Sequence, residues 1–177
     1  MSGHSKWAQI KYKKAATDAK KGKIFSKLSR AITVVVKELG NDPKTNSKLA
    51  SAIEEARKAN MPSDNIARAI DKAASKDGNE LKEVLYEAYG PGGSALIITA
   101  VTDSSNRTTN EIKHILAEHE GKLGVEGSAM WAFDKIGKEF NPKFPTQLSE
   151  EDSKKFESLL DALDNQDDVL DVYSNSI

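Results

Sequence analysis

The spacing of the hydrophobic residues changes near residue 78, and this change limits the folds that the chain can adopt. From residue 20 to residue 39 the apolar positions recur every three or four residues, which places them on one face of an α-helix. They are Phe25, Leu28, Ile32, Val35 and Leu39. Residues 81–89 and 94–101 are instead rich in β-branched and aromatic side chains, as strands are. We therefore expect a helical domain over residues 1–77 and an α+β domain over residues 78–177.

The helical domain is expected to contain two more helices before a short polar linker at residues 76–79. One covers residues 47–60, and the other begins after Pro62 with Ser63 as its N-cap. The positions that face inward in these two helices are mostly small: Leu49, Ala52, Ile53, Ala56, Ile66, Ala69, Ile70 and Ala73. Small inward side chains let helices pack closely but leave a thin core. We predict a compact bundle of three or four helices.

The second domain is expected to begin with a β-hairpin, because Gly90, Pro91, Gly92 and Gly93 separate its first two strands and can form only a turn. The elements expected after the hairpin are a helix over 108–119, strands over 128–134 and 138–144, a helix over 149–163 and a strand over 169–173. From Ser94 onward the order is β-α-β-β-α-β, which is that of ferredoxin-like folds. The predicted fold class is therefore α+β, with a small helical domain followed by a ferredoxin-like domain that has an extra hairpin strand.

The two predicted domains carry opposite charges. The first 76 residues hold 17 Lys and Arg against 7 Asp and Glu, and the last 101 hold 9 against 20. A formal charge of +10 is thus followed by one of −11, although the whole chain carries only −1. Such a chain either folds its halves onto each other or presents one charged face to a charged partner. The grouping of the basic residues favours the second interpretation, with nucleic acid as the partner.

The basic residues are most concentrated at the start of the chain. Residues 1–30 contain nine Lys or Arg and a single Asp, with Trp7, Tyr12 and Phe25 interleaved. Clustered cations bind phosphates, and aromatic rings among them can stack on exposed bases. The alternative is a solvated helix face with Trp7 and Tyr12 packed inside. The predicted nucleic-acid-binding residues are His4, Lys6, Trp7, Lys11, Lys13, Lys14, Lys20, Lys21, Lys23, Lys27, Arg30 and, from the acidic domain, Arg107.

Lysine outnumbers arginine in this segment, and the difference affects the expected mode of binding. Few guanidinium groups are present to make bidentate contacts with guanine, so we expect contact with the phosphate backbone and no reading of bases. In the predicted helix over 20–39, the basic positions Lys20, Lys23, Lys27 and Arg30 fall opposite the apolar stripe. The helix is therefore predicted to have two distinct faces.

Several functional classes lack the residues that they need. The chain has no cysteine, which excludes disulfides, thiolate zinc sites and cysteine nucleophiles and is compatible with the cytoplasm. No apolar stretch approaches the length of a membrane span, and the basic start lacks the apolar core of a secretion signal. His114 and His119 are off a common helix face, and the 90–93 loop lacks the Gly-Lys-Ser/Thr ending of a phosphate loop. We expect no enzyme activity, metal, cofactor, small-molecule substrate or membrane partner.

Several motifs, in the same order along the chain, resemble those of the YebC/PmpR family. The matching segments are Ser2 to Trp7 with Ile10-Lys11, Lys14 to Ala16 and Asp18 to Phe25; Tyr86 to Gly93 with Thr102-Asp103 and Asn106 to Thr108; Gly127-Ser128, Trp131 and Phe133-Asp134; and Leu160 to Leu163 with Asp168-Val169 and Val172-Tyr173. Family members usually insert a further α/β domain between the strand near Phe133 and the final helix. This chain has only a short connection over residues 135–148, so it is similar to a short version of the family.

The resemblance implies a non-enzymatic regulator of gene expression that binds nucleic acid. Members are commonly described as DNA-binding transcriptional regulators, and this is the leading hypothesis. Related proteins, including a mitochondrial translational activator of a cytochrome oxidase subunit, imply the alternative of a ribosome- or RNA-binding translation factor that relieves stalled elongation. A less favoured hypothesis is a protein-interaction module in which the basic domain pairs with the acidic domain of a neighbouring copy. A homodimer through the second domain stays open.

Overall fold

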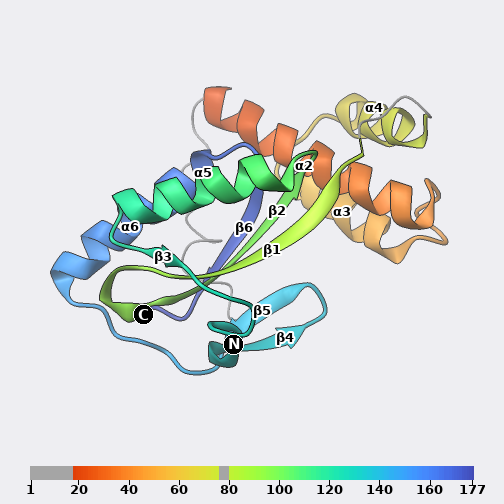
Figure 1. Ribbon diagram of the computed structural model, residues 1–177. Coiled ribbons are helices and arrows are strands. Elements are labelled where there is room, and N and C mark those ends of the chain that lie inside the picture. Colours follow the sequence, from red (N-terminus) through yellow and green to blue (C-terminus); the bar gives the residue numbers. More distant parts are fainter. Residues whose placement is uncertain (1–17, 76–79) are drawn as a thin grey trace. The chain divides into compact units, whose positions relative to one another are not determined.

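The computed structural model describes residues 18–75 and 80–177, and it divides them into two compact units (Figure 1). The helical unit extends to Glu83 and also includes Val101–Asp103, and the sheet unit comprises residues 84–100 and 104–177. The predicted boundary between residues 77 and 78 and the predicted linker at 76–79 lie outside the described residues. Among the described residues, none of the helices is long and apolar enough to cross a membrane.

The described part of the helical unit contains three helices, α2 (Asp18–Leu39), α3 (Ser47–Lys58) and α4 (Ser63–Ala74). Ser63, predicted as an N-cap, is instead the first residue of α4, and Pro62 occupies the N-cap position. Helix α2 packs against both α3 and α4. The buried core of the unit consists of Ile32, Val35, Val36, Leu49, Ala56, Met61, Ile66, Ala69 and Ala73. The predicted inward faces of the three helices are thus confirmed, and the many alanines allow the close packing.

Leu39 is the exception, because it was predicted to face inward and is 53% exposed. Helix α2 ends there, and Gly40 follows with φ of +90°. The buried polar side chain of Asn46 closes this end of the helix in place of an apolar one. Its Nδ2 donates to the backbone oxygens of Val35 and Gly40, at 2.9 and 2.8 Å. Its Oδ1 accepts from the backbone N–H of Leu49 at 3.0 Å, so one side chain caps the end of α2 and the start of α3.

The centre of the sheet unit is a four-stranded sheet of β1 (Lys82–Tyr89), β2 (Ala95–Thr102), β3 (Lys122–Leu123) and β6 (Val169–Ser174), in the order β3-β1-β2-β6. Strands β2 and β6 pair antiparallel with Ile98 opposite Val172, and β1 and β3 pair antiparallel with Ala88 opposite Leu123. The predicted hairpin turn between β1 and β2 is present and contains the short 3-10 helix η1 (Pro91–Gly93).

Both faces of this sheet are covered. Helices α5 (Ser105–Glu118) and α6 (Glu150–Asn165) lie on one face, and a separate two-stranded sheet of β4 (Phe133–Ile136) and β5 (Glu139–Pro142) lies on the other (Figure 1). The helix-side core includes Leu96, Ile98, Ile112, Leu116, Leu159 and Leu163, and the opposite core includes Ala95, Ile97, Ala129, Ala132, Phe133 and Phe140. Because β2 is buried on both faces, its apolar residues are continuous and do not alternate with polar ones.

The predicted fold class is confirmed, since a helical part precedes an α+β part in which two helices lie on one face of an antiparallel four-stranded sheet. The assignment of strands to that sheet was wrong for both strands expected between its helices, since residues 138–144 contain β5, which pairs with β4 in the separate two-stranded sheet. Residues 128–134 do not form one of its strands, because residues Met130–Ala132 are the 3-10 helix η2 and only β4 follows. Strand β1, expected as an extra strand, is central in the sheet, and the two-residue strand β3 was too short for its pattern to be recognised.

Candidate nucleic-acid interface

The predicted contact residues on α2 differ in their exposure. Lys20 and Lys21, in the first turn, are exposed, whereas Lys23 and Arg30 are half-buried. Lys27 is only 5% exposed, although it lies away from the apolar stripe as predicted. Val34, two turns further along the same side of α2, is also 5% exposed, so this side of the helix is covered. Phosphate contact by Lys27 stays a prediction, and its burial counts against it.

Half of the predicted contact residues lie outside the described residues. They are His4, Lys6, Trp7, Lys11, Lys13 and Lys14. Their role in binding therefore rests on the charge and aromatic pattern of the sequence. Within the described part of α2, Lys20 and Lys21 are the predicted contacts that the fold leaves exposed to solvent.

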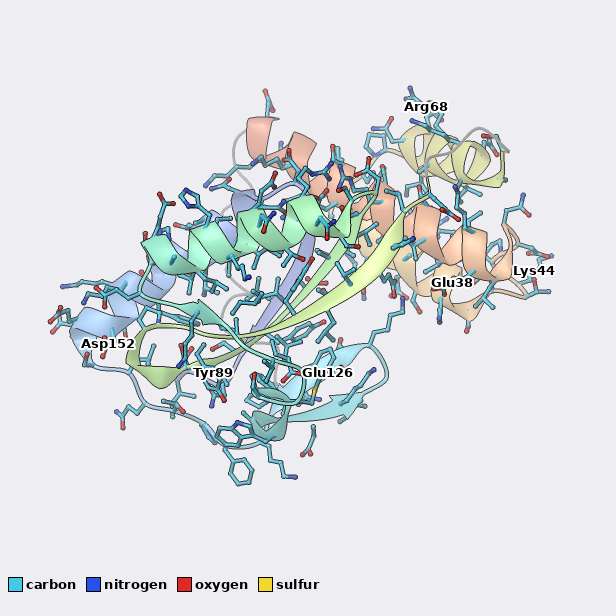
Figure 2. All side chains as sticks on the ribbon, in the orientation of Figure 1. Glu38, Lys44, Arg68, Tyr89, Glu126 and Asp152 are labelled. Carbon is cyan, nitrogen blue, oxygen red and sulfur yellow. The ribbon has the colours of Figure 1, made fainter. Side chains whose placement is uncertain are left out.

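Ion pairs neutralise part of the positive charge elsewhere in the helical unit. Lys48 Nζ lies 2.9 Å from Glu38 Oε2, and the hydrogen bond with Glu38 raises the pKa of Lys48 above its usual range. Lys58 pairs with Glu54 across one turn of α3 at 3.1 Å. Both pairs are exposed, so they stabilise the fold little, but they lower the positive potential beside α3. The loop after α2 adds an exposed cation at Lys44 (Figure 2).

Arg107 has a structural contact in the sheet unit. Its Nη2 donates to Asp168 Oδ2 at 2.9 Å, and the same oxygen accepts from Thr108 Oγ1 at 2.7 Å. Asp168 is 2% exposed. A buried carboxylate needs such partners, because removal of its compensating charge and hydrogen bonds is strongly destabilising. A contact between Arg107 and phosphate stays a prediction, and it would compete with this ion pair.

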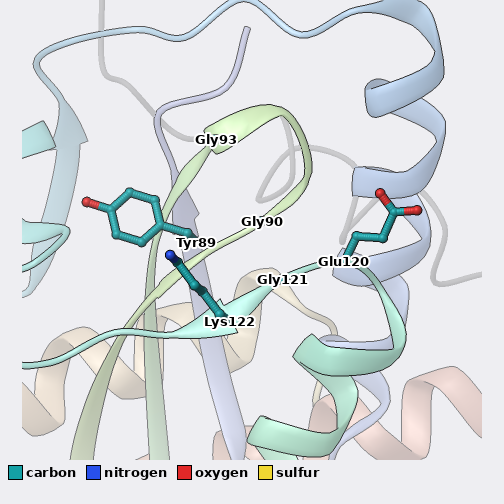
Figure 3. Close-up of a pocket in the computed structure, with 6 residues that line it drawn as sticks. All are labelled: Tyr89, Gly90, Gly93, Glu120, Gly121 and Lys122. Atoms are coloured by element: carbon teal, nitrogen blue, oxygen red, sulfur yellow. The ribbon is translucent and has the colours of Figure 1, made fainter.

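A pocket of about 360 Å³ lies where the β1-β2 turn meets the connection from α5 to β3. Three glycines, Gly90, Gly93 and Gly121, line it together with Tyr89, Glu120 and Lys122. Figure 3 shows Lys122 extending toward Tyr89, with Glu120 on the far side of the glycines. The fold requires a glycine at position 121, because a Cβ there would lie 2.7 Å from the backbone oxygen of Tyr89. The glycine-rich turn, predicted from the sequence as a hairpin turn only, therefore also forms one wall of this pocket.

The buried carboxylate of Glu87 holds the loop that follows β3. Its Oε1 accepts from the backbone N–H of Gly127 at 2.6 Å, and its Oε2 accepts from Ala129 and Met130 at 2.7 and 2.8 Å. Glu87 is 5% exposed. Three N–H groups that converge on one carboxylate form an anion-binding concavity of the kind also found at helix N-termini. Sequence reasoning missed this role because Glu87 alternates with apolar residues like any polar residue in a strand.

The described part of the chain contains no group of three or more His, Asp or Glu side chains that could hold a metal ion. His114 instead lies 3.3 Å from Glu118 within α5, and His119 Nδ1 lies 2.8 Å from the backbone oxygen of Ile115. Both histidines of the sheet unit thus have a contact partner four positions away in the sequence.

Comparison with protein families gives two matches that together cover nearly the whole chain. Residues 5–76 match the model described as the TACO1/YebC protein N-terminal domain. Residues 81–139 and 137–176 match the model described as the TACO1/YebC second and third domain. The break in the second match falls at the turn between β4 and β5, where Ile136 pairs with Glu139.

Individual relatives agree with these matches. A protein of Thermoanaerobacter pseudethanolicus, named a probable transcriptional regulatory protein, is 41% identical over 237 residues, which cover 99% of this chain and 96% of the relative. One of Caldanaerobacter subterraneus with the same description is 40% identical over 99% of this chain and 98% of its own. The crystal structure of a conserved hypothetical protein from Aquifex aeolicus has a TM-score of 0.86 at 34% identity, and the match covers 98% of this chain and 97% of that one.

The comparisons also agree with the shortening predicted from the sequence, and the family match indicates its place. The two alignments extend over 237 residues although this chain has 177, so the relatives contain residues without a counterpart here. The family model breaks at residues 137–139. In this chain only Gly137 and Lys138 connect β4 to β5, and Gly137 has φ of +64°, which glycine adopts without strain.

Proposed function

Because this chain belongs to the TACO1/YebC family, we propose that it is a non-enzymatic regulator of gene expression that binds nucleic acid through its basic N-terminal half. The observation that carries the proposal is the charge of that half, 17 Lys and Arg against 7 Asp and Glu. The naming of its relatives as probable transcriptional regulatory proteins supports the regulatory part. DNA is the leading target, and ribosomal RNA is the alternative.

Lys20 and Lys21 are the described residues best suited to test this proposal. Both are exposed and lie in the first turn of α2, where a cation is unfavourable for the helix dipole. Their replacement by glutamine should therefore leave the helix intact or stabilise it slightly. Any loss of binding in the double variant Lys20→Gln/Lys21→Gln then reports lost phosphate contacts and not unfolding.

The test measures the affinity of the full chain for a 20-base-pair DNA duplex at several salt concentrations. Each phosphate contact contributes about −0.9 to the slope of log K against log salt for duplex DNA. The Lys20→Gln/Lys21→Gln variant should therefore bind several-fold more weakly near 0.1 M salt and show a slope that is shallower by about two. A charge-matched control, Lys113→Gln/Lys154→Gln, changes two exposed lysines of α5 and α6 and should bind as the unchanged chain does. Equal binding by all three proteins, or a flat salt response of the unchanged chain, would contradict the proposal.

A second comparison, made at one salt concentration, distinguishes DNA from ribosomal RNA as the target. Retention on duplex DNA without co-sedimentation with ribosomes would support a transcriptional regulator. Co-sedimentation with ribosomes that is lost in the Lys20→Gln/Lys21→Gln variant, with weak retention on duplex DNA, would support the translation factor. The same lysine surface serves either target, because lysines contact phosphates without reading bases.

A further inference from the structure

Three aromatic side chains in the sheet unit lie in series beside the glycine-lined pocket. The ring of Tyr89 lines the pocket, and its hydroxyl accepts from Trp131 Nε1 at 3.0 Å. The Trp131 ring in turn lies 5.8 Å from that of Phe144, measured between centroids. Trp131 and Phe144 are 54% and 51% exposed, which is unusual for such large apolar groups in a folded chain. We call Tyr89, Trp131 and Phe144 the aromatic strip.

Hydrogen bonds hold two side chains of the aromatic strip, Tyr89 and Trp131, in place. Trp131 Nε1 also donates to the backbone oxygen of Ser128 at 2.9 Å, and the Tyr89 hydroxyl donates to the same oxygen. The loop that carries Ser128 is fixed by the three N–H groups that bind the Glu87 carboxylate. The exposed Trp131 ring therefore does not have to be ordered when a ligand binds, which lowers the entropic cost of binding.

Lysines flank the aromatic strip at both ends. Lys122 lies at the pocket end, beside Tyr89 (Figure 3). Lys143 lies at the other end, with Nζ 5.7 Å from the Phe144 ring centroid and 3.4 Å from Asp134. The second half of the chain has only 9 Lys and Arg against 20 Asp and Glu, yet three of these nine fall within residues 135–143. The stretch 135–143, which ends next to Phe144, therefore has three lysines and one glutamate in a half that is acidic as a whole.

We propose that the aromatic strip binds unpaired bases of single-stranded nucleic acid by stacking, with Lys122 and Lys143 close to the phosphates on either side. Exposed aromatic rings between cations are the arrangement by which proteins hold single strands, because every base has a flat face that can stack whatever its sequence. The strip cannot reach bases that are already stacked in a duplex. The inference rests on the proposed function and adds to it a second contact, specific for single strands, in the half of the chain that is otherwise repelled by phosphate.

The test compares the affinity of the full chain for a 12-nucleotide oligouridine RNA with its affinity for a DNA duplex of 12 base pairs. Each affinity is measured from the fluorescence anisotropy of the labelled nucleic acid. Trp131→Leu keeps an apolar side chain but removes the aromatic face, and it should lower the affinity for oligouridine about ten-fold. Trp131→Phe keeps a ring and should stay within about three-fold of the unchanged chain. Neither substitution should change duplex affinity. Val125→Ala, which shortens a side chain that is 78% exposed, is the apolar control and should have no effect.

A second variant tests stacking without disturbing the loop that carries Ser128. Phe144→Leu leaves the hydrogen bonds of Tyr89, Trp131 and Ser128 intact, so a loss of oligouridine binding in this variant cannot come from a disordered loop. Unchanged oligouridine binding in both leucine variants would overturn the proposal. If Lys20→Gln/Lys21→Gln loses binding while the leucine variants do not, the proposed function stands and only the aromatic strip is refuted. A concentration-dependent dimer that Trp131→Leu abolishes, without any effect on RNA, would mean that a second copy of the chain covers the strip.

Discussion

The Glu87 carboxylate permits a test in which one substitution removes a charge and leaves the shape of the side chain unchanged. In Glu87→Gln one of the two terminal oxygens becomes an NH2 group. The arrangement that costs least keeps the remaining oxygen on the N–H groups of Ala129 and Met130, which lie 2.7 and 2.8 Å from Oε2. The amide nitrogen then faces the N–H of Gly127, so two donors oppose each other where a 2.6 Å hydrogen bond was.

The size of the effect follows from these three bonds. A hydrogen bond to a charged group contributes about 1.5–3 kcal/mol and a neutral one about 0.5–1.5 kcal/mol, so each of the two retained bonds loses about 1 kcal/mol. The lost third bond removes about 1–2 kcal/mol more. Burial of a neutral amide costs less than burial of a carboxylate, which offsets part of this loss. We expect a net destabilisation of about 2–3 kcal/mol, which for a chain of this size lowers the melting temperature by roughly 5–10 °C.

Thermal unfolding followed by circular dichroism measures this change. Glu126→Gln is the matched control, because Glu126 is exposed, lies in the same loop and loses the same charge (Figure 2). It should shift the melting temperature by less than about 1 °C. The near-ultraviolet signal of Trp131 should also weaken in Glu87→Gln, since the loop held by Glu87 positions Ser128 beneath that ring. If the two variants melted together, the carboxylate would not organise this loop and the reasoning would fail.

Two further substitutions test other parts of the fold. Asn46→Ala removes the buried side chain that bonds to Val35, Gly40 and Leu49, and it should lower the free energy of unfolding in urea by about 2–3 kcal/mol. The control Ser47→Ala, at the exposed neighbouring position, should lower it by less than about 0.5 kcal/mol. A loss below about 1 kcal/mol in Asn46→Ala would mean that Asn46 is only an ordinary helix cap. Hydrogen bonds to Glu151 and Glu120 raise the pKa of Lys155 above its ordinary value of 10.5, so its contribution to stability is present below about pH 10.5 and declines as the pH rises further. The melting-temperature difference between the unchanged chain and Lys155→Gln should accordingly be constant from pH 6 to pH 9 and shrink above pH 10.5, and a difference that grew with pH would refute this sign.

The sequence predicted the elements whose patterns are long. Helix α2 repeats its apolar positions over several turns, and the glycine-rich turn admits only a hairpin, so both were predicted correctly. Strand β3 was missed because Lys122 and Leu123 are too few to show alternation. The strand expected over 128–134 is partly a 3-10 helix because its backbone N–H groups bind Glu87, 40 or more positions earlier in the chain. No pattern of neighbouring residues in the sequence indicates a hydrogen-bond partner so far along the chain.

The same limit applies to the candidate site. Charge counts located the basic half, since charge is a property of composition, but they could not show that Lys27 is buried while Lys20 and Lys21 are exposed. Arg107 was proposed as a phosphate contact from its place near a helix start, and its pairing with Asp168 depends on a residue 61 positions away, in the turn before β6. The aromatic strip was not foreseen either, because Tyr89, Trp131 and Phe144 come from separate segments and only the fold brings them into series.

The two proposed contacts differ in physical origin, and salt separates them. Binding by Lys20 and Lys21 releases counterions, so its contribution falls as salt rises, whereas stacking on Trp131 and Phe144 involves uncharged faces and depends little on salt. Duplex DNA uses only the first contact, whereas a single strand also stacks on the aromatic strip. Trp131→Leu should therefore lower the single-strand affinity by about the same factor at every salt concentration and leave the slope of log K against log salt unchanged. Lys20→Gln/Lys21→Gln should instead make that slope shallower by about 1.4, because each phosphate contact contributes about −0.7 for single strands, and a slope changed by Trp131→Leu would refute the assignment.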